Sequence, residues 1–357
     1  SNDEIRYVYN LDKKEYVDLF KQPTQWCHYS NEIGIGPVKI NSFALLTGCG
    51  KYDRDNIIKS LDKKIKSGYK LSGSLNVVNN DENYDYDVDV YNKGDFYKVI
   101  LTNKNNDHTQ VILKNKDGVY VLTPALNKSF KFQSDWPYNN SQIYLLNALL
   151  NDLKNDKDLE FKEKDDKYVF KSKVKYVNNT KLDYQKLVLG KDLAFEKVIV
   201  YDKDGIEAMT MVFDNIDYSY KFKSNEFDLD TVLSNSEEEL KETSSLEDVI
   251  YPLYIPSGTK LVNEDKIKKD NGERVIMNYD GDKSFLLVEE TSEVFNEFTV
   301  IPTIGEPYQL MDTLGVVTNN SLSWTSGGID YYLVSEVLSQ DEMIEVAQSI
   351  SGIVSMK

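Results

Sequence analysis

The chain has 357 residues, and its 42 lysines and arginines against 59 aspartates and glutamates give a formal net charge of −17. This length predicts about two domains, and the 40% of hydrophobic residues, with 25 Tyr and 14 Phe, suffices for buried cores rather than wholesale disorder. The acidic balance argues against nucleic acid as a partner, because nucleic-acid-binding proteins concentrate Lys and Arg on one face. No apolar run is long enough to predict a membrane-spanning helix.

Soft metal ligands and common nucleophile motifs are scarce. The chain has two cysteines, Cys27 and Cys49, and two histidines, His28 and His108. A disulfide scaffold or a structural zinc site needs more of these residues at recognisable spacings. Gly34-Ile35-Gly36 lacks the third glycine and the preceding strand of a dinucleotide-binding fingerprint. The sequence therefore predicts no metal, no cofactor and no catalytic residue.

Two amphipathic helices are predicted in the first half of the chain. The first covers residues 53–66, and Gly68 follows it as a stop signal. The second covers residues 139–153, with Asn140 or Ser141 as its N-cap. Their apolar faces consist of Ile57, Ile58, Leu61 and Ile65 in the first helix and of Ile143, Leu146, Leu149, Leu150 and Leu153 in the second.

Alternating apolar and polar residues predict a large antiparallel sheet from residue 69 onward. Along 84–90, Tyr and Val side chains point to one face and Asp side chains to the other. The turn sequence Asn115–Gly118 predicts a hairpin. Further strands are predicted at 96–101, 109–113, 119–122, 130–132, 158–163, 167–177, 183–190, 195–203 and 207–218. Strands separated by short turns favour a meander rather than parallel βαβ units.

The acidic run 81–89 allows two interpretations. Counted from Asp85, an EF-hand loop would need Gly at position 6 and Glu at position 12, but these positions hold Val90 and Phe96. Strict alternation instead places Asp85, Asp87 and Asp89 together on one strand face, which is typical of a solvated surface. Binding of a cation by this strand stays open.

The second half of the chain predicts a linker followed by a small α+β domain. Residues 234–247 are polar, acidic and nearly free of core residues, so we expect proteases to cleave there first. Beyond them, strands are predicted at about 259–263, 273–279, 284–290 and 330–335, before a final helix at 340–350. The buried face of that helix is predicted to consist of Met343, Ile344, Val346, Ala347 and Ile350. The predicted domains are a leader at 1–49, a β domain at 50–233, the linker at 234–247 and the α+β domain at 248–357.

Leu45-Leu46-Thr47-Gly48-Cys49 has the form of a lipobox. In such a motif an apolar run and small residues precede a cysteine whose thiol is lipidated, and the small residues let the processing enzymes approach the backbone. Only Phe43–Leu46 are continuously apolar upstream, whereas a signal peptide has 7–15 apolar residues after a basic segment. Lipidated Cys49 behind an atypical leader, and a chance Gly-Cys pair in a buried strand, are the two alternatives.

The segment from Lys114 through Pro137 carries a family resemblance. It contains Lys-Asn-Lys-Asp-Gly-Val-Tyr-Val-Leu-Thr-Pro-Ala-Leu-Asn-Lys at 114–128 and Phe-Lys-Phe-Gln-Ser-Asp-Trp-Pro at 130–137. It resembles the LolA-like lipoprotein carrier family, in its GerS-like branch of sporulation and germination lipoproteins from spore-forming bacteria. The resemblance covers about residues 50–230. Residues 322–333 and the helix at 340–350 are similar to a small domain appended to such lipoproteins.

The resemblance implies a curved antiparallel half-barrel with helices at its mouth, which binds acyl chains or apolar protein segments in its concave face without catalysis. The residues expected to line this groove are Tyr84, Tyr86, Val88, Tyr97, Val99, Tyr120, Leu122, Phe130 and Phe132. Ordinary core packing is the alternative for all nine, because any β protein buries alternating aromatic residues.

Together these features predict a non-enzymatic protein outside the cytoplasm, anchored to the cell or spore membrane through Cys49. Its expected ligand is an acyl chain or an envelope protein, and the resemblance allows a cell-wall amidase as that partner. A carboxylate-dependent hydrolase acting on envelope polymers is the alternative. Two converging carboxyl groups with raised pKa would favour the hydrolase, and an apolar site without them would favour the binding protein. A soluble lipoprotein shuttle is a third option, against which a lipid on Cys49 would speak.

Overall fold

The structure is a computed structural model that describes residues 7–10, 15–18, 53–79, 82–105, 107–133, 141–176, 179–235, 249–270, 272–295, 297–310 and 313–354. Residues 1–53 and 54–357 form two separate compact units. The first contains an antiparallel pair of strands, β1 (Tyr7–Asn10) and β2 (Glu15–Asp18). Cys49 and the rest of the lipobox-like motif lie outside the described residues.

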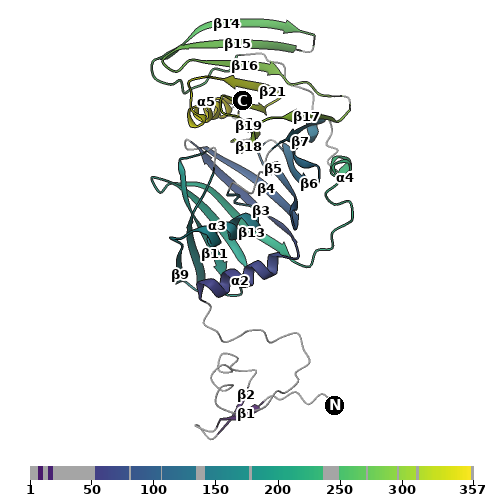
Figure 1. The fold of residues 1–357 in the computed structure, drawn as a ribbon, viewed down its shortest axis with the longest axis vertical. Helices are drawn as coiled ribbons and strands as arrows, with labels where there is room; N and C mark the ends of the chain where they lie inside the picture. The colour runs from purple at the N-terminus through teal and green to yellow at the C-terminus, as the bar shows by residue number, and fades with distance from the viewer. Residues whose placement is uncertain are drawn as a thin grey trace. The chain divides into compact units, whose positions relative to one another are not determined.

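Among the described residues, a twelve-stranded sheet is the largest element of the second unit (Figure 1). Its strands are β3 (Tyr69–Asn79), β4 (Glu82–Lys93), β5 (Phe96–Asn103), β6 (Thr109–Asn115), β7 (Gly118–Thr123), β8 (Lys128–Phe132), β9 (Glu160–Lys164), β10 (Lys167–Lys173), β11 (Leu182–Gly190), β12 (Phe195–Asp202), β13 (Glu207–Asp217) and β17 (Thr299–Thr303). Two antiparallel meanders, β3 to β8 and β9 to β13, join where β3 pairs with β13. The sheet is open, since β17 and β9 form its two ends. The predicted mainly β fold with one large antiparallel sheet is confirmed.

Local sequence chemistry explains the hairpin between β6 and β7. Asn115 pairs with Gly118, as predicted, and the Asp117 N–H donates to Asn115 Oδ1 at 2.8 Å. Gly118 has φ +139°, a conformation that side chains with a Cβ rarely adopt. A one-turn 3₁₀ helix, η2 (Pro124–Leu126), then leads into β8.

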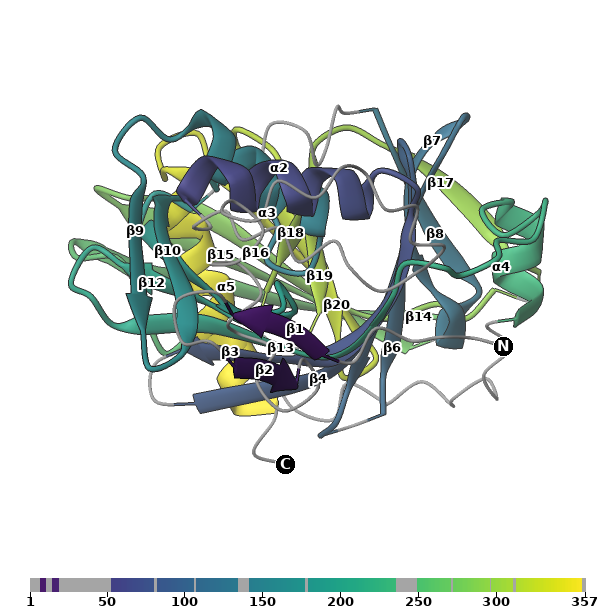
Figure 2. The ribbon, with the colours of Figure 1, turned by 90° about the horizontal axis from the view of Figure 1, so that it is seen from below.

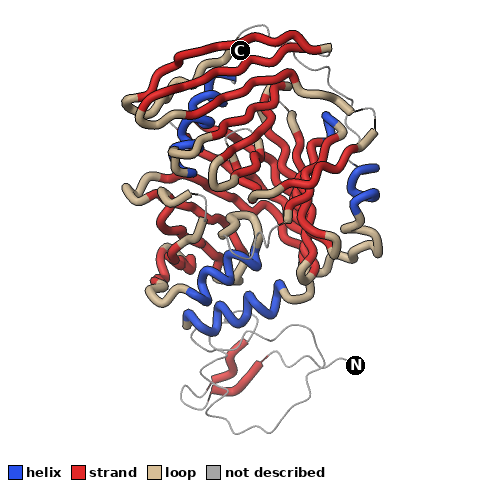
Figure 3. Tube along the Cα trace, turned by 45° about the horizontal axis from the view of Figure 1, so that its top comes forward, coloured by secondary structure: helices blue, strands red, loops and turns tan. Residues whose placement is uncertain are grey.

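Helices α2 (Arg54–Ile65) and α3 (Leu146–Asn155) lie side by side (Figure 2 and Figure 3). The predicted first helix is confirmed, with Ile57, Leu61 and Ile65 buried. The second begins at Leu146 and not near residue 139. Ser141 is not its cap, because its backbone and hydroxyl are paired with Lys175, both at 2.7 Å. Asn140 lies outside the described residues.

The start of α3 is held by a side chain from the sheet instead of by a capping residue. The first N–H groups of a helix have no intrahelical acceptor and need partners from elsewhere. No side chain caps α3 at its N-cap residue, Leu145, but the Leu146 N–H donates to the Tyr69 hydroxyl on β3 at 3.0 Å. Tyr69 thereby fixes the helix against the sheet face it covers.

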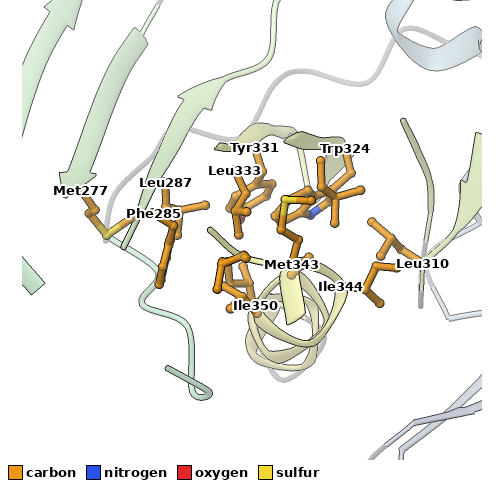
Figure 4. Close-up of a cluster of buried hydrophobic side chains, with 14 of the residues drawn as sticks. Met277, Phe285, Leu287, Leu310, Trp324, Tyr331, Leu333, Met343, Ile344 and Ile350 are labelled. Carbon is orange, nitrogen blue, oxygen red and sulfur yellow. The ribbon is translucent and has the colours of Figure 1, made fainter. Parts of the chain in front are cut away.

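A second, seven-stranded sheet is formed by the described part of residues 249–354. It consists of β14 (Thr259–Lys269), β15 (Gly272–Gly281), β16 (Phe285–Thr291), β21 (Ile329–Val334), β20 (Ser321–Ser326), β19 (Leu314–Val317) and β18 (Glu306–Gln309), in that spatial order. Helix α5 (Gln340–Val354) packs against it. The predicted buried face of this helix is confirmed, and Met343 and Ile350 point toward the core (Figure 4). In that core Trp324 stacks on Tyr331, with the ring centroids 4.9 Å apart.

One strand of the C-terminal region belongs to the first sheet. Strand β17 pairs in parallel with β8, from Thr299 opposite Lys128 to Thr303 opposite Phe132. Beside this pairing, the Lys128 ammonium lies 3.0 Å from Asp330 Oδ2 on β21, and both side chains are nearly buried. The two sheets are therefore linked by the strand pairing of β17 with β8 and by the ion pair between Lys128 and Asp330. Of the predicted linker 234–247, the first two residues fall in helix α4 (Leu229–Asn235), and residues 236–248 lie outside the described residues.

Candidate binding site

Strand register decides which of the nine predicted groove residues share a face. On β4, Tyr84, Tyr86 and Val88 alternate with exposed or half-exposed aspartates, as predicted. Directly opposed residues point to the same side of a sheet, so the pairing of Val90 with Val99 adds Tyr97 and Val99 to this face. Val99 is paired with Ile112, and Ile112 with Val121. Val121 is in turn paired with Phe130, so Phe130 and Phe132 lie on this face as well. We call this side the helix-covered face, because Tyr69 of β3 shares it and contacts α3.

The prediction is wrong for Tyr120 and Leu122, which do not share this face. They lie on the opposite face of β7, in a cluster with Val111, Leu113, Phe227 and Val232 beside α4. The sequence of β7 explains the error, since four consecutive residues, Val119–Leu122, are buried and no polar residue marks a solvent side. A charge at Leu122 would therefore disturb packing near α4 and leave the helix-covered face untouched.

The helix-covered face is not an open groove at these positions. Six of the seven residues on it are at most 3% exposed, and Phe130 is half-buried. The helices alone would leave part of the sheet bare, but the second sheet also reaches it. The Leu314 N–H donates to Gln110 Oε1 at 2.7 Å, and Gln309 Nε2 lies 3.4 Å from the Tyr86 hydroxyl. The predicted open groove assumes that only the two helices cover this face. The additional cover comes from the second sheet, about 200 residues further along the chain.

A cavity of about 100 Å³ remains where the first sheet meets β18 and β19. Its walls come from the ends of β3 and β13, from the segment before α3, from the β10–β11 connection and from α5. The lining residues are Val77, Val78, Gln142, Tyr144, Tyr176, Asn179, Leu182, Ala208, Met209, Pro307, Tyr308, Gln309, Leu314 and Gln348. None of them is charged. We call this space the junction cavity.

Two polar atoms of lining residues are buried and lack a hydrogen-bond partner among the described residues. They are the Tyr176 hydroxyl and Gln309 Oε1. Nε2 of Gln309 donates to the carbonyl oxygen of Leu310 at 2.8 Å, which identifies the amide nitrogen and so fixes the side-chain orientation. By contrast, the Tyr308 hydroxyl accepts a hydrogen bond from Asn179 Nδ2 at 2.9 Å.

The three tyrosine hydroxyls at the junction cavity carry no charge at neutral pH. Burial raises the pKa of Tyr144, Tyr176 and Tyr308 above the ordinary value of a phenol, since a buried phenolate would lose its hydration. The cavity therefore offers neutral hydroxyls, amides and apolar walls.

Carboxyl groups with raised pKa are found elsewhere and do not converge. Burial raises the pKa of Glu289, in the core of the second sheet, to about 7, and that of Asp152, on α3, to about 6. Asp152 accepts a hydrogen bond from Gln185 Nε2 at 2.9 Å, and Glu289 accepts one from the Ile250 N–H at 3.1 Å. Neither residue lines the junction cavity. The arrangement required of a carboxylate pair for hydrolysis is not present at this site.

The aspartate face of β4 is engaged with neighbouring side chains. Lys104 Nζ lies 2.8 Å from Asp87 Oδ1, and Asn76 donates to Asp85 Oδ1 at 2.9 Å. In the described part of the chain, no group of three or more His, Cys, Asp or Glu side chains is placed to hold a metal ion. No helix within the same residues has the length and hydropathy needed to cross a membrane.

Sequence reasoning missed the residues that form the junction cavity. The sequence predicts Met209 only as part of a strand, and Tyr308 and Leu314 lie on strands of four residues, which are too short to show a periodic pattern. Only Tyr176 carried a usable signal, as an aromatic residue at the end of a predicted strand. These residues meet through pairings between distant segments, which local periodicity does not encode.

No family model matches the chain. The sporulation protein YdcC of Bacillus subtilis (strain 168) is 38% identical over 315 residues, which cover 86% of this chain and 93% of that protein. A putative outer membrane lipoprotein-sorting protein domain from Vibrio parahaemolyticus is 12% identical, with a TM-score of 0.32 over 50% of this chain and 96% of that one. The complex of the CwlD amidase with the GerS lipoprotein from Clostridioides difficile contains a chain 15% identical, with a TM-score of 0.22 over 49% of this chain and 99% of that one.

The sequence identities and TM-scores of the two solved structures are too low to support a conclusion about what this chain binds. The relative from Bacillus subtilis does confirm the predicted resemblance to sporulation proteins, because the match extends over nearly the whole of that protein. The chain belongs to the family of the sporulation protein YdcC.

Proposed function

We propose that this chain is a non-enzymatic sporulation or germination protein that works outside the cytoplasm, is anchored to a membrane through Cys49 and acts by binding an envelope protein. Its membership of the YdcC family supports the link to sporulation. The lipobox-like sequence Leu45–Cys49 supports the anchor. A cell-wall amidase is one partner that fits this description.

The observation that carries the proposal is the uncharged junction cavity between the two sheets. Hydrolysis of a glycan or peptide needs groups that transfer protons or attack the substrate, whereas recognition needs apolar walls with a few neutral polar atoms. The cavity has the composition expected for recognition, with apolar walls and a few neutral polar atoms. Neither of the two carboxyl groups of raised pKa, Glu289 and Asp152, lines the cavity, although Asp152 is near enough to raise the pKa of the lining residue Tyr176. Burial is the main cause of the raised pKa of both carboxyl groups.

The size of the cavity favours a protein over an acyl chain. Pockets that enclose small molecules usually measure about 300–1,000 Å³. The junction cavity, at about 100 Å³, holds only a small part of a ligand, the rest of which would lie outside it. A partner protein meets this requirement by inserting one part of its surface.

In-cell photo-crosslinking tests this function. A benzophenone amino acid at Gln348, a half-buried residue lining the cavity, is expected to capture a specific envelope protein in sporulating cells. The matched control carries the same group at Tyr332, which is 43% exposed on the other face of the second sheet. Mass spectrometry identifies the product. Capture of lipid alone at position 348, or the same products at both positions, would refute the proposal.

The lipid anchor makes a separate prediction. Metabolic labelling with an alkynyl fatty acid should tag the wild-type protein, whereas Cys49→Ser should abolish the label, because the thiol is the acylated atom. The matched control is Cys27→Ser, which removes the other cysteine and should label normally. Equal labelling of wild type and Cys49→Ser would end the anchoring hypothesis.

A further inference from the structure

We infer that the junction cavity receives one uncharged aliphatic side chain, together with its peptide group, from a segment of the partner. The inference rests on the proposed function and adds the chemical class of what is bound. It is carried by the volume, the charge and the unpaired polar atoms of the cavity.

The volume and the walls select the side chain. An apolar cavity of about 150 Å³ is known to hold one benzene molecule. The junction cavity is smaller, at about 100 Å³, and its apolar walls include Val77, Met209 and Leu314. A single Val, Leu or Ile side chain suits this space, whereas most of a long acyl chain would remain outside.

The absence of charge among the lining residues restricts the ligand further. A buried ionised group needs an opposite charge or several hydrogen bonds to compensate for lost hydration. All fourteen lining residues are neutral types, in a chain in which 28% of residues are charged. Lysine, arginine, aspartate and glutamate side chains are therefore poor occupants.

The unpaired atoms select a peptide group over an acyl chain. The Tyr176 hydroxyl is a donor and Gln309 Oε1 an acceptor, and neither has a partner among the described residues. A peptide group brings one C=O acceptor and one N–H donor, which match this pair in hydrogen-bonding type. A fatty acid ester could accept from Tyr176, but it has no donor for Gln309.

This assignment predicts an unusual effect of Tyr176→Phe on stability. Removing a buried hydroxyl normally destabilises a protein, because its hydrogen bond is lost. The Tyr176 hydroxyl is buried without a hydrogen bond in the free protein, which costs stability. Its removal should therefore raise the melting temperature by about 2–4 °C. The matched control, Tyr184→Phe, removes a hydroxyl on the opposite face of the first sheet and should give no such rise.

Binding is tested on the whole 357-residue chain with [¹³C-methyl]methionine label, by following the Met209 methyl resonance, which Met209→Leu assigns. N-acetyl-L-leucinamide is expected to shift this resonance with a Kd in the millimolar range. Tyr176→Phe should weaken that binding about five- to tenfold, through loss of one hydrogen bond. Val77→Phe, which fills the cavity, should abolish it. Sodium octanoate and N-acetyl-L-lysinamide are the comparison probes and should leave the resonance in place.

Several results would overturn the inference. They are a shift of the Met209 resonance with octanoate but not with leucinamide, equal shifts with leucinamide and lysinamide, no shift with any probe, or a lower melting temperature of Tyr176→Phe. Its failure is separable from failure of the proposed function. A protein crosslinked at Gln348, together with no binding of leucinamide, would leave the proposed function standing and refute the peptide-group assignment alone.

Discussion

Replacing Lys128 with methionine is expected to lower the free energy of unfolding by about 3–5 kcal/mol, because the substitution leaves the buried Asp330 carboxylate without its counter-charge. The two side chains are only 7% and 11% exposed, and their charged atoms are 3.0 Å apart. Methionine retains most of the length and apolar contact of the lysine stem. The loss therefore reports the uncompensated charge rather than a packing defect.

Denaturant unfolding of the wild type, Lys128→Met and Lys128→Met/Asp330→Asn measures this effect. The double variant should regain much of the lost stability, since asparagine carries no charge to bury. Lys104→Met is the matched control, because it breaks the exposed pair with Asp87 and should change stability by less than about 1 kcal/mol. If Lys128→Met behaved like Lys104→Met, the pair would not matter for joining the two sheets.

Glu289 is expected by itself to lower the stability of the wild type by about 3 kcal/mol as the pH rises from about 4.5 through about 7. Burial is the main cause of its raised pKa, Glu264 adds to the effect, and the Ile250 N–H and Lys266 oppose it. The folded state holds the proton on Glu289 at a pH where the unfolded chain has released it. Protons are thus bound more tightly by the folded state, and raising the pH destabilises it. Asp152, whose pKa is raised to about 6, contributes with the same sign.

Glu289→Gln should remove the part of this pH dependence that Glu289 causes and leave the part that Asp152 causes. It should also make the protein more stable than wild type above about pH 7, since glutamine keeps an acceptor for the Ile250 N–H without a charge to bury. Denaturant unfolding at several pH values between 5 and 8 gives both curves. Asp280→Asn, an exposed carboxyl in the same sheet, is the control and should leave the pH dependence as in wild type. Parallel curves for Glu289→Gln and wild type would show that Glu289 does not cause the loss.

Strictly alternating sequences were informative about structure, and uniformly apolar ones were not. On β4, the aspartates between Tyr84, Tyr86 and Val88 mark the solvent side, so the buried face was predicted correctly. On β7, Val119–Leu122 are buried on both sides, so the pattern could not place Tyr120 and Leu122. Turn chemistry worked at Asn115–Gly118 because the required conformation is local. The start of α3 could not be predicted, because Ser141 pairs with Lys175 of a distant segment.

The candidate site was less predictable than the fold because its parts are far apart in sequence. The expected groove residues are real core residues of the helix-covered face, apart from Tyr120 and Leu122, but most are buried beneath the helices and the second sheet. The junction cavity is created by β18 and β19, whose four residues each are too few for a period to be recognised. Only the long-range pairing, such as that of Leu314 with Gln110, brings them to the first sheet.

The parallel pairing of β17 with β8 has a consequence for how the chain folds. Strand β8 ends at residue 132, but its outer neighbour β17 begins only at Thr299. The backbone N–H and C=O groups on the outer edge of β8 therefore have no strand partner until β17 has been synthesised. An unpaired edge is a template for association with other chains, and contacts of such long sequence separation form slowly. During synthesis, self-association through the unpaired edge of β8 therefore competes with the native pairing of β8 with β17. In the folded protein β17 forms the outer edge, and its Pro302 has no N–H to donate, which makes this edge a poorer template for another strand.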